Sequence, residues 1–302
     1  MENNREKEYL YIILHIPKTG GETIKKHIVE NMKHGEYLIL DYERNSKLEL
    51  RKNVDKYLAY MGNKEKNKIK VIIGHKVYYG LHKFFQKKPR YITFLRNPYD
   101  LTVSKYNFIK TKLKDKLFKD NVIYFKLRRF IKNENLSDLT LKEFVNKKDE
   151  VNNLIVKSII NNGISLKEVI SDKRFKKQID TNHLNKTKKI LKNFYFIGLT
   201  EEKNDYLFVY GLLNIKVFFN NQNISKKYFL INKSKDFEQI KKIIRIKNRE
   251  DFAIYKFGKM VNKKFKINTK KYYKNEVNKI IIKKYFKFPI WKTKQFFYKF
   301  FQ

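Results

Sequence analysis

The 302-residue sequence contains no cysteine, and it has 30 acidic residues against 70 basic ones. Without cysteine, a disulfide framework, thiol chemistry and a thiolate metal site are all excluded. The chain also lacks any apolar run of about 20 residues, so we expect no membrane span. The first ten residues are charged and contain no apolar stretch, so we expect neither a signal peptide nor a membrane anchor there.

The shortage of acidic residues leaves a formal net charge of +40. Such a charge attracts nucleic acid, anionic lipid or an acidic polysaccharide. A compositional explanation is equally good, because Lys, Asn and Ile are all abundant and Lys commonly covers solvated surfaces. The charge alone therefore identifies no partner, and a basic membrane-surface or nucleic-acid binding protein remains an alternative.

Short apolar and β-branched runs alternate along the chain with segments of helical character. We expect strands at Tyr9–Ile16, Tyr37–Asp41, Lys70–Gly74, Arg90–Leu95 and Asn193–Leu199. We expect helices from Glu22, from Pro98 to about Lys110, through much of 111–190, and from Thr200. This alternation predicts an α/β fold with a central, mostly parallel sheet flanked by helices.

A change in composition divides the chain near its C-terminal end. We expect one domain over residues 1–261 and a basic, aromatic, helical tail over residues 262–302. Aromatic residues such as Trp291 and Phe297, beside Lys292 and Lys294, suit an interfacial segment on anionic lipid. A helix packed on the core, or a disordered segment, explains the same composition.

The turn Pro17–Gly21 separates the first apolar run from the first helical segment. At a helix start the backbone N–H groups lack intrahelical partners and the helix dipole is positive, and glycine lets the backbone approach a ligand closely. Lys18 adds a full positive charge. The turn therefore predicts a phosphate site. It is not the P-loop of nucleoside triphosphatases, because in that motif the lysine follows the glycines, and here Lys18 precedes them.

A second candidate anion contact follows the strand expected at Arg90–Leu95. Asn97 suits a helix N-cap and Pro98 the first helical position. Arg96 offers a planar fork for bidentate phosphate contact, and the hydroxyl of Ser104, two turns into the helix, can reach the same group. Taken alone, Arg96 could equally be a structural ion-pair partner.

These two segments resemble known binding motifs. The order His15-Ile16-Pro17-Lys18-Thr19-Gly20-Gly21 resembles the 5′-phosphosulfate loop of sulfotransferases, and Arg96 with Pro98 and Ser104 resembles their 3′-phosphate motif. The sequence looks in particular like the family of heparan and chondroitin carbohydrate sulfotransferases and their bacterial relatives. Weaker likenesses at Gly74–Gly80, Asn153–Lys157 and Phe196–Glu201 extend the resemblance over residues 9 to 261.

The resemblance implies a P-loop-like three-layer fold and transfer of a sulfuryl group from 3′-phosphoadenosine 5′-phosphosulfate (PAPS) to a carbohydrate hydroxyl by in-line displacement. It implies donor binding by Lys18, Thr19, Gly20, Gly21, Glu22, Thr23, Arg96 and Ser104. It also implies acceptor contacts by Asn153 and Lys157, where Lys157 stands in place of the usual arginine. Lys18 would neutralise charge in the reaction, and His75 would be the general base.

Glu22 and His15 differ from the other residues of the first motif. Glu22 stands where the family has Thr or Ser, and its carboxylate either turns outward to serve the helix dipole or is an alternative base. His15, at the end of the first strand, is expected to be structural. The reaction requires no metal, and no carboxylate and histidine cluster with ligand spacing indicates one.

The expected partner is a carbohydrate acceptor, either a polysaccharide or a glycolipid, and no specific nucleic acid is expected. We expect a cytoplasmic location, with a peripheral position on the inner face of the membrane, through the tail, as an alternative. A nucleotide-dependent kinase-like phosphotransferase is the other enzyme class to consider. It is disfavoured because the sequence has neither a Walker A motif nor an Asp-rich metal-binding run after a strand.

Overall fold

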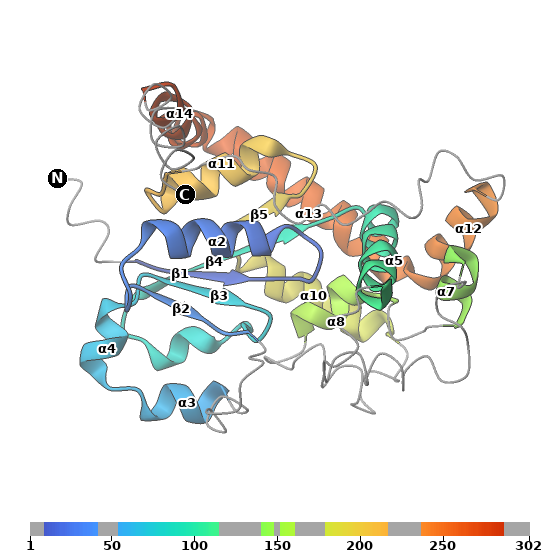
Figure 1. The fold of residues 1–302 in the computed structure, drawn as a ribbon, viewed down its shortest axis with the longest axis horizontal. Coiled ribbons are helices and arrows are strands. Elements are labelled where there is room, and N and C mark those ends of the chain that lie inside the picture. The colour runs from blue at the N-terminus through green and yellow to red at the C-terminus, as the bar shows by residue number, and fades with distance from the viewer. Residues whose placement is uncertain are drawn as a thin grey trace, which may run out of the picture.

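The computed structural model describes residues 9–41, 54–114, 140–147, 152–160, 179–216 and 237–286. Within these ranges, five strands form one parallel sheet in the order β2-β3-β1-β4-β5 (Figure 1). They are β1 (Tyr9–Leu14), β2 (Tyr37–Ile39), β3 (Val71–Gly74), β4 (Lys88–Leu95) and β5 (Phe196–Leu199). The predicted α/β fold with a mostly parallel sheet is confirmed.

Helices cover both faces of this sheet. The helical elements are α2 (Gly21–Asn31), α3 (Val54–Tyr60), α4 (Asn63–Lys68), the short 3-10 helix η2 (Leu81–Phe84), α5 (Pro98–Lys114), α7 (Leu141–Lys147), α8 (Leu154–Ile160), α10 (Thr181–Lys192), α11 (Lys203–Leu212), α12 (Phe237–Lys247), α13 (Arg249–Asn268) and α14 (Lys270–Phe286). Apolar residues of α2, α11 and α14 pack on one face, and those of α3, α8, α10 and α13 pack on the other. This arrangement is compatible with three layers.

Strand β1 lies at the centre of the sheet and is buried on both faces. Leu10 and Ile12 belong to the apolar cluster on one face, and Ile13 belongs to the cluster on the other. This is the period of two that a strand imposes on its side chains. The continuous apolar run in the sequence therefore reflects a strand with helices on both sides.

A smaller apolar cluster lies to one side of the sheet, where α5, α7 and α12 pack together (Figure 1). Buried contacts come from Val103 and Tyr106 of α5, Phe144 of α7 and Ile244 of α12. Val103 and Tyr106 lie on either side of Ser104 in the sequence. The cluster therefore fixes the part of α5 that contains Ser104, the helix that follows β4.

One predicted helix start is wrong. We expected a helix from Thr200, but α11 begins at Lys203. Both the backbone N–H and the hydroxyl of Thr200 donate to the carbonyl of Leu95, at 2.9 and 3.0 Å. Thr200 therefore extends the pairing of β5 with β4 instead of starting a helix.

The predicted boundary between residues 261 and 262 lies within α13. On its C-terminal side, Asn262 donates through Nδ2 to the carbonyl of Ile197 at 2.8 Å and to Asp205 Oδ2 at 2.9 Å. Tyr273 of α14 donates to Asp205 Oδ1 at 2.7 Å. Residues 262–280 thus form helices packed on the core, whereas residues 287–302, including Trp291, lie outside the described residues. A separate tail domain stays a prediction.

None of the helices in the described ranges combines the length and the apolar character that a membrane span requires.

Candidate functional site

The connection from β1 to α2 is a tight turn with two residues in the left-handed region. Lys18 has φ 70° and Gly20, the N-cap of α2, has φ 81°. A Cβ atom on Gly20 would overlap the hydroxyl of Tyr206, and one on Gly21 would overlap the ring of His15. The two glycines are therefore required by backbone conformation and by close packing.

Internal hydrogen bonds hold the shape of this turn. Thr19 is buried, and its hydroxyl donates to the carbonyl of Ile16 at 2.7 Å. The hydroxyl of Tyr206, from α11, donates to the carbonyl of Thr19 at 3.1 Å. The hydroxyl of Thr19, one of the predicted donor contacts, thus stabilises the turn itself.

Two predicted cationic residues meet at the carboxyl ends of neighbouring strands. Arg96, which follows β4, donates from Nη1 to the carbonyl of Lys18, which follows β1, at 3.0 Å. Burial and the charge of Arg96 lower the pKa of Lys18. Because the two cations repel each other, an anion bound between them would relieve the repulsion. Ligands of open α/β sheets bind at this edge.

Ser104, the other residue predicted to bind the 3′-phosphate, lies on α5, the helix that follows Arg96. As expected, Pro98 is its first residue, and Asn97 caps it by accepting from the N–H of Tyr99 at 3.0 Å. Lys18 Nζ lies 4.5 Å from the ring centroid of Phe108. Ser104 precedes Phe108 by four residues and so lies on the same face of α5. That Ser104 and Arg96 bind one phosphate stays a prediction.

His75, directly after β3, is held by a carboxylate that the sequence did not single out. Asp41 Oδ1 accepts from the ring Nδ1 of His75 at 2.6 Å and from its backbone N–H at 2.9 Å. A carboxylate only accepts, so Nδ1 bears the hydrogen and Nε2 is the unprotonated nitrogen of the neutral ring. The only sequence signal for Asp41 is its position at the end of the strand expected at Tyr37–Asp41.

Asp41 also pairs with Lys25 of α2, whose Nζ lies 2.5 Å from Asp41 Oδ2. Burial raises the pKa of Asp41, but the hydrogen bonds and charges of His75 and Lys25 outweigh burial and hold this pKa well below its usual value. These two partners therefore stabilise the ionised form of Asp41.

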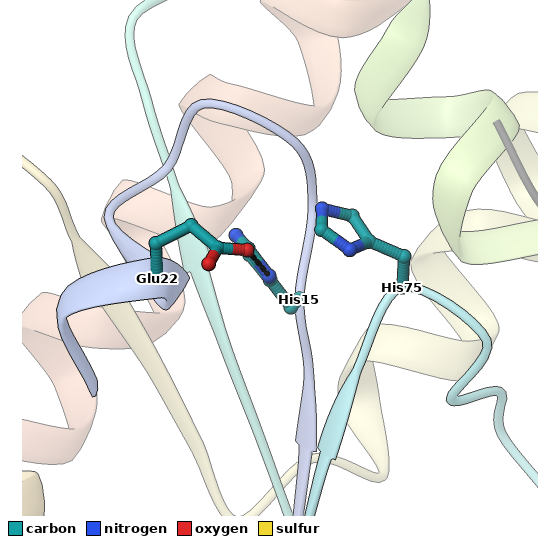
Figure 2. Close-up of side chains that lie close together, drawn as sticks. All are labelled: His15, Glu22 and His75. Carbon is teal, nitrogen blue, oxygen red and sulfur yellow. Dashed lines mark ion pairs between the residues drawn. The ribbon is translucent and has the colours of Figure 1, made fainter. Parts of the chain in front are cut away.

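His15 and Glu22 lie beside His75 (Figure 2). The ring centroids of His15 and His75 are 4.1 Å apart, and Glu22 Oε1 lies 3.9 Å from His15 Nδ1. Burial and the charge of His75 lower the pKa of His15 well below its usual value. Lys25 Nζ lies 2.7 Å from Glu22 Oε2, so this carboxylate, an unexpected residue at an anion site, is partly neutralised.

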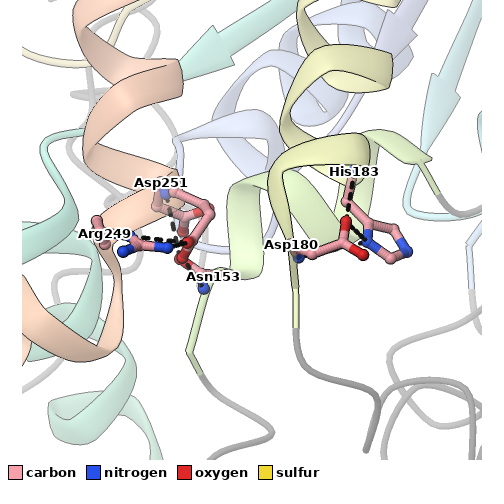
Figure 3. A network of polar contacts seen from close by, with 6 residues as sticks. Asn153, Asp180, His183, Arg249 and Asp251 are labelled. Carbon is pink, nitrogen blue, oxygen red and sulfur yellow. Dashed lines mark hydrogen bonds and ion pairs between the residues drawn. The ribbon is translucent and has the colours of Figure 1, made fainter.

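The predicted acceptor residue Asn153, just before α8, belongs to a buried network with the start of α13 (Figure 3). Lys157, on α8, is also buried. Asn153 donates from Nδ2 to Glu250 Oε2 at 2.7 Å and accepts from the N–H of Asp251 at 3.1 Å. Burial raises the pKa of Asp251 to about 7, against the opposing effects of two backbone N–H groups and the charge of Lys157. The structure thus gives Asn153 an internal role, and acceptor binding by either residue stays a prediction.

The structure therefore gathers most, but not all, of the predicted site residues at one edge of the sheet. The turn at residues 17–21, the start of α2, His75 and Arg96 all follow the carboxyl ends of β1, β3 and β4. Neither a scan against protein-family models nor a search of curated protein sequences finds a match to this chain.

Proposed function

We propose that this protein transfers a sulfuryl group from PAPS to a hydroxyl of a carbohydrate acceptor, on a P-loop-like α/β fold. The observation that supports the proposal most is the contact between Arg96 and the carbonyl of Lys18, at the carboxyl ends of β4 and β1. These two residues belong to the two sequence motifs that resemble the donor-binding motifs of carbohydrate sulfotransferases.

In this proposal the 5′-phosphosulfate lies at the start of α2. The backbone of Gly20, Gly21 and Glu22 provides N–H donors at the positive end of the helix dipole, whereas the N–H groups of Thr19 and Thr23 donate within the turn to the carbonyls of Ile16 and Gly20. Lys18 neutralises the negative charge that develops on the oxygen bridging phosphorus and sulfur. Arg96 and Ser104 bind the 3′-phosphate, which distinguishes this donor from ordinary adenine nucleotides.

The acceptor hydroxyl attacks sulfur in line with the bridging oxygen. A new bond forms between the acceptor oxygen and sulfur, and the bond from sulfur to the bridging oxygen breaks. Adenosine 3′,5′-bisphosphate leaves with the electron pair of that bond. The hydroxyl proton passes to Nε2 of His75, since Asp41 holds the other ring nitrogen in its protonated form. Asp41 is thus a positioning residue for the proposed base.

Glu22 is compatible with this site because of where its carboxylate lies. It is half exposed, at 47%, and is paired with Lys25. The proposal therefore assigns Glu22 no contact with the phosphosulfate through its side chain, only through its backbone.

The proposal is tested by calorimetric titration of the full chain with adenosine 3′,5′-bisphosphate in the absence of magnesium. We expect micromolar binding, weakened roughly 100-fold in Lys18→Ala and in Arg96→Ala because each removes a charged contact to phosphate. Lys26→Ala is the matched control, since Lys26 lies on the same helix, α2, and pairs with Glu30 on the surface. Its affinity should equal that of the wild type.

The same titration separates the alternatives. Equal binding of any polyanion, abolished by moderate salt, would favour a basic membrane-surface or nucleic-acid binding protein. Magnesium-dependent binding of ATP in preference to the bisphosphate would favour a kinase-like phosphotransferase. Either result would contradict the proposed sulfotransferase.

A further inference from the structure

His15, Glu22 and His75 form a cluster that the proposed transfer does not fully use. Each offers one ligand atom, and the three atoms lie within 4.8 Å of one another. They come from the end of β1, the start of α2 and the end of β3, so their spacing in the sequence does not reveal the cluster.

The ring nitrogen Nδ1 of His15 is an unusual feature of this cluster. The side chain of His15 is only 2% exposed, and Nδ1 has no hydrogen-bond partner among the described residues. A buried polar atom without a partner is costly, and such atoms call for a specific explanation. Figure 2 shows the ring of His15 between Glu22 and His75.

The three residue types are those that bind a transition-metal ion. Two imidazoles and one carboxylate make a His2Glu set, which binds Zn²⁺ and leaves a fourth position open for water or substrate. The neutral imidazole is the form that coordinates a metal.

Asp41 supplies the outer support that metal-binding histidines commonly have. By accepting from Nδ1 of His75 at 2.6 Å, it fixes the orientation of that ring and leaves Nε2 as the ligand atom. Lys25, at 2.5 Å from Asp41 and 2.7 Å from Glu22, balances these two carboxylates.

The three ligand atoms, which lie within 4.8 Å of one another, must move closer together to bind one ion. Ligand atoms around a tetrahedral Zn²⁺ lie about 3.3 Å apart. The separation between His15 Nδ1 and Glu22 Oε1 is 3.9 Å. Because the side chain of Glu22 is 47% exposed, it has room to rotate, and the site is open to solvent on that side.

We propose that His15 Nδ1, the Glu22 carboxylate and His75 Nε2 bind one divalent transition-metal ion, for which Zn²⁺ is the best-fitting candidate. This inference goes beyond the proposed transfer, which needs no metal. It also has a consequence for that transfer. The lone pair of His75 Nε2 cannot bind an ion and accept a proton at the same time, so Zn²⁺ would inhibit a reaction in which His75 is the base.

Titration of the metal-free full chain with Zn²⁺ by calorimetry, and with Co²⁺ by visible absorption, tests the site. We expect one ion per chain and the absorption of a low-symmetry, tetrahedral-type Co²⁺ complex. Affinity should fall by about 100-fold in Glu22→Ala and in His75→Ala, since each removes one of three ligands. Glu22→Ala is the primary variant, because its half-exposed side chain can be removed without disturbing the core.

Matched controls use histidines outside the cluster. His34 is exposed, and His183 pairs with Asp180 at the start of α10, as Figure 3 shows. The double variant His34→Ala/His183→Ala should bind Zn²⁺ as the wild type does. No stoichiometric binding, or equal affinity in the wild type and in both cluster variants, would overturn the proposal.

Lys18→Ala separates a test of the metal site from a test of the proposed sulfuryl transfer. Lys18→Ala removes a proposed donor contact but no metal ligand, so it should lose bisphosphate affinity and keep Zn²⁺ affinity. Loss of Zn²⁺ binding in Lys18→Ala would contradict the assigned ligands, whatever the result with the bisphosphate.

Discussion

Asp41 accepts two hydrogen bonds from His75, one from the ring Nδ1 at 2.6 Å and one from the backbone N–H at 2.9 Å. The two residues are 34 positions apart and follow the neighbouring strands β2 and β3. This pairing fixes both the orientation and the tautomer of the imidazole. It is the feature that makes His75 suitable as a base in the proposed transfer.

Replacing Asp41 tests this positioning role. In Asp41→Asn, the side-chain amide no longer holds the Nδ1–H tautomer by charge, so we expect the turnover of sulfuryl transfer to fall by roughly 100-fold. The affinity for adenosine 3′,5′-bisphosphate should stay unchanged, which steady-state kinetics and calorimetry measure together. Glu36→Gln is the control, because Glu36 pairs with Lys70 on the surface and should retain full turnover. An equal loss of donor affinity in Asp41→Asn would indicate a general structural defect instead.

Asp41 also predicts how stability depends on pH. Its pKa is lower in the folded protein than in the unfolded chain, so its ion pairs stabilise the fold at pH values above the usual pKa of Asp, about 3.9. That stabilisation is lost as the pH falls below this value. Urea unfolding at pH 6 and at pH 3 should show a larger loss of stability in the wild type than in Asp41→Asn. Parallel losses in the two proteins would refute this contribution.

Alanine substitutions at Gly20 and Gly35 together test whether Tyr206 constrains the turn. Both Gly20 and Gly35 have positive φ angles, but a Cβ atom would overlap Tyr206 at Gly20 and meets nothing within 4 Å at Gly35. We expect Gly35→Ala to cost only the strain of a left-handed residue, about 1–2 kcal/mol in urea unfolding. Gly20→Ala should cost more and should also weaken bisphosphate binding, because Tyr206 must move away from the turn. Equal effects of the two substitutions would show that Tyr206 does not constrain the turn.

The buried network around Asn153 predicts a loss of stability. Asn153→Ala removes the hydrogen-bond partner of Glu250 Oε2 and of the N–H of Asp251, which should cost about 1–3 kcal/mol in denaturant unfolding. Exposed Asn182, on α10, is the control, and Asn182→Ala should change stability by less than about 0.5 kcal/mol. If Asn153→Ala is as stable as the wild type but raises the KM for the acceptor, the sequence-based assignment of Asn153 to the acceptor site is the better one.

The sequence predicted the parts of the site that depend on local order. The apolar run before Pro17, and the cap formed by Asn97 and Pro98, are patterns of neighbouring residues, and they place Lys18 and Arg96 correctly at the ends of strands. The order of the strands was not predictable in the same way. Asp41 and His75 meet only because β2 pairs with β3, a long-range contact that no local pattern encodes.

Two polar residues have hydrogen-bond partners that the local sequence could not reveal. Thr200 has the character of a helix start, but hydrogen bonds to Leu95 in the neighbouring strand override that preference. Asn153 resembles an acceptor residue of the family, but its amide is occupied by Glu250 and Asp251, almost 100 residues further along the chain. In both cases tertiary partners determine the role of a polar side chain.

In the proposed function, Arg96 recognises the 3′-phosphate of PAPS. Calorimetry of adenosine 3′,5′-bisphosphate and adenosine 5′-monophosphate, with the wild type and Arg96→Ala, tests it most directly. We expect the wild type to bind the bisphosphate about 100-fold more tightly than the monophosphate, and we expect this preference to disappear in Arg96→Ala. Equal affinity of the wild type for both nucleotides, or a preference that survives in Arg96→Ala, would contradict it.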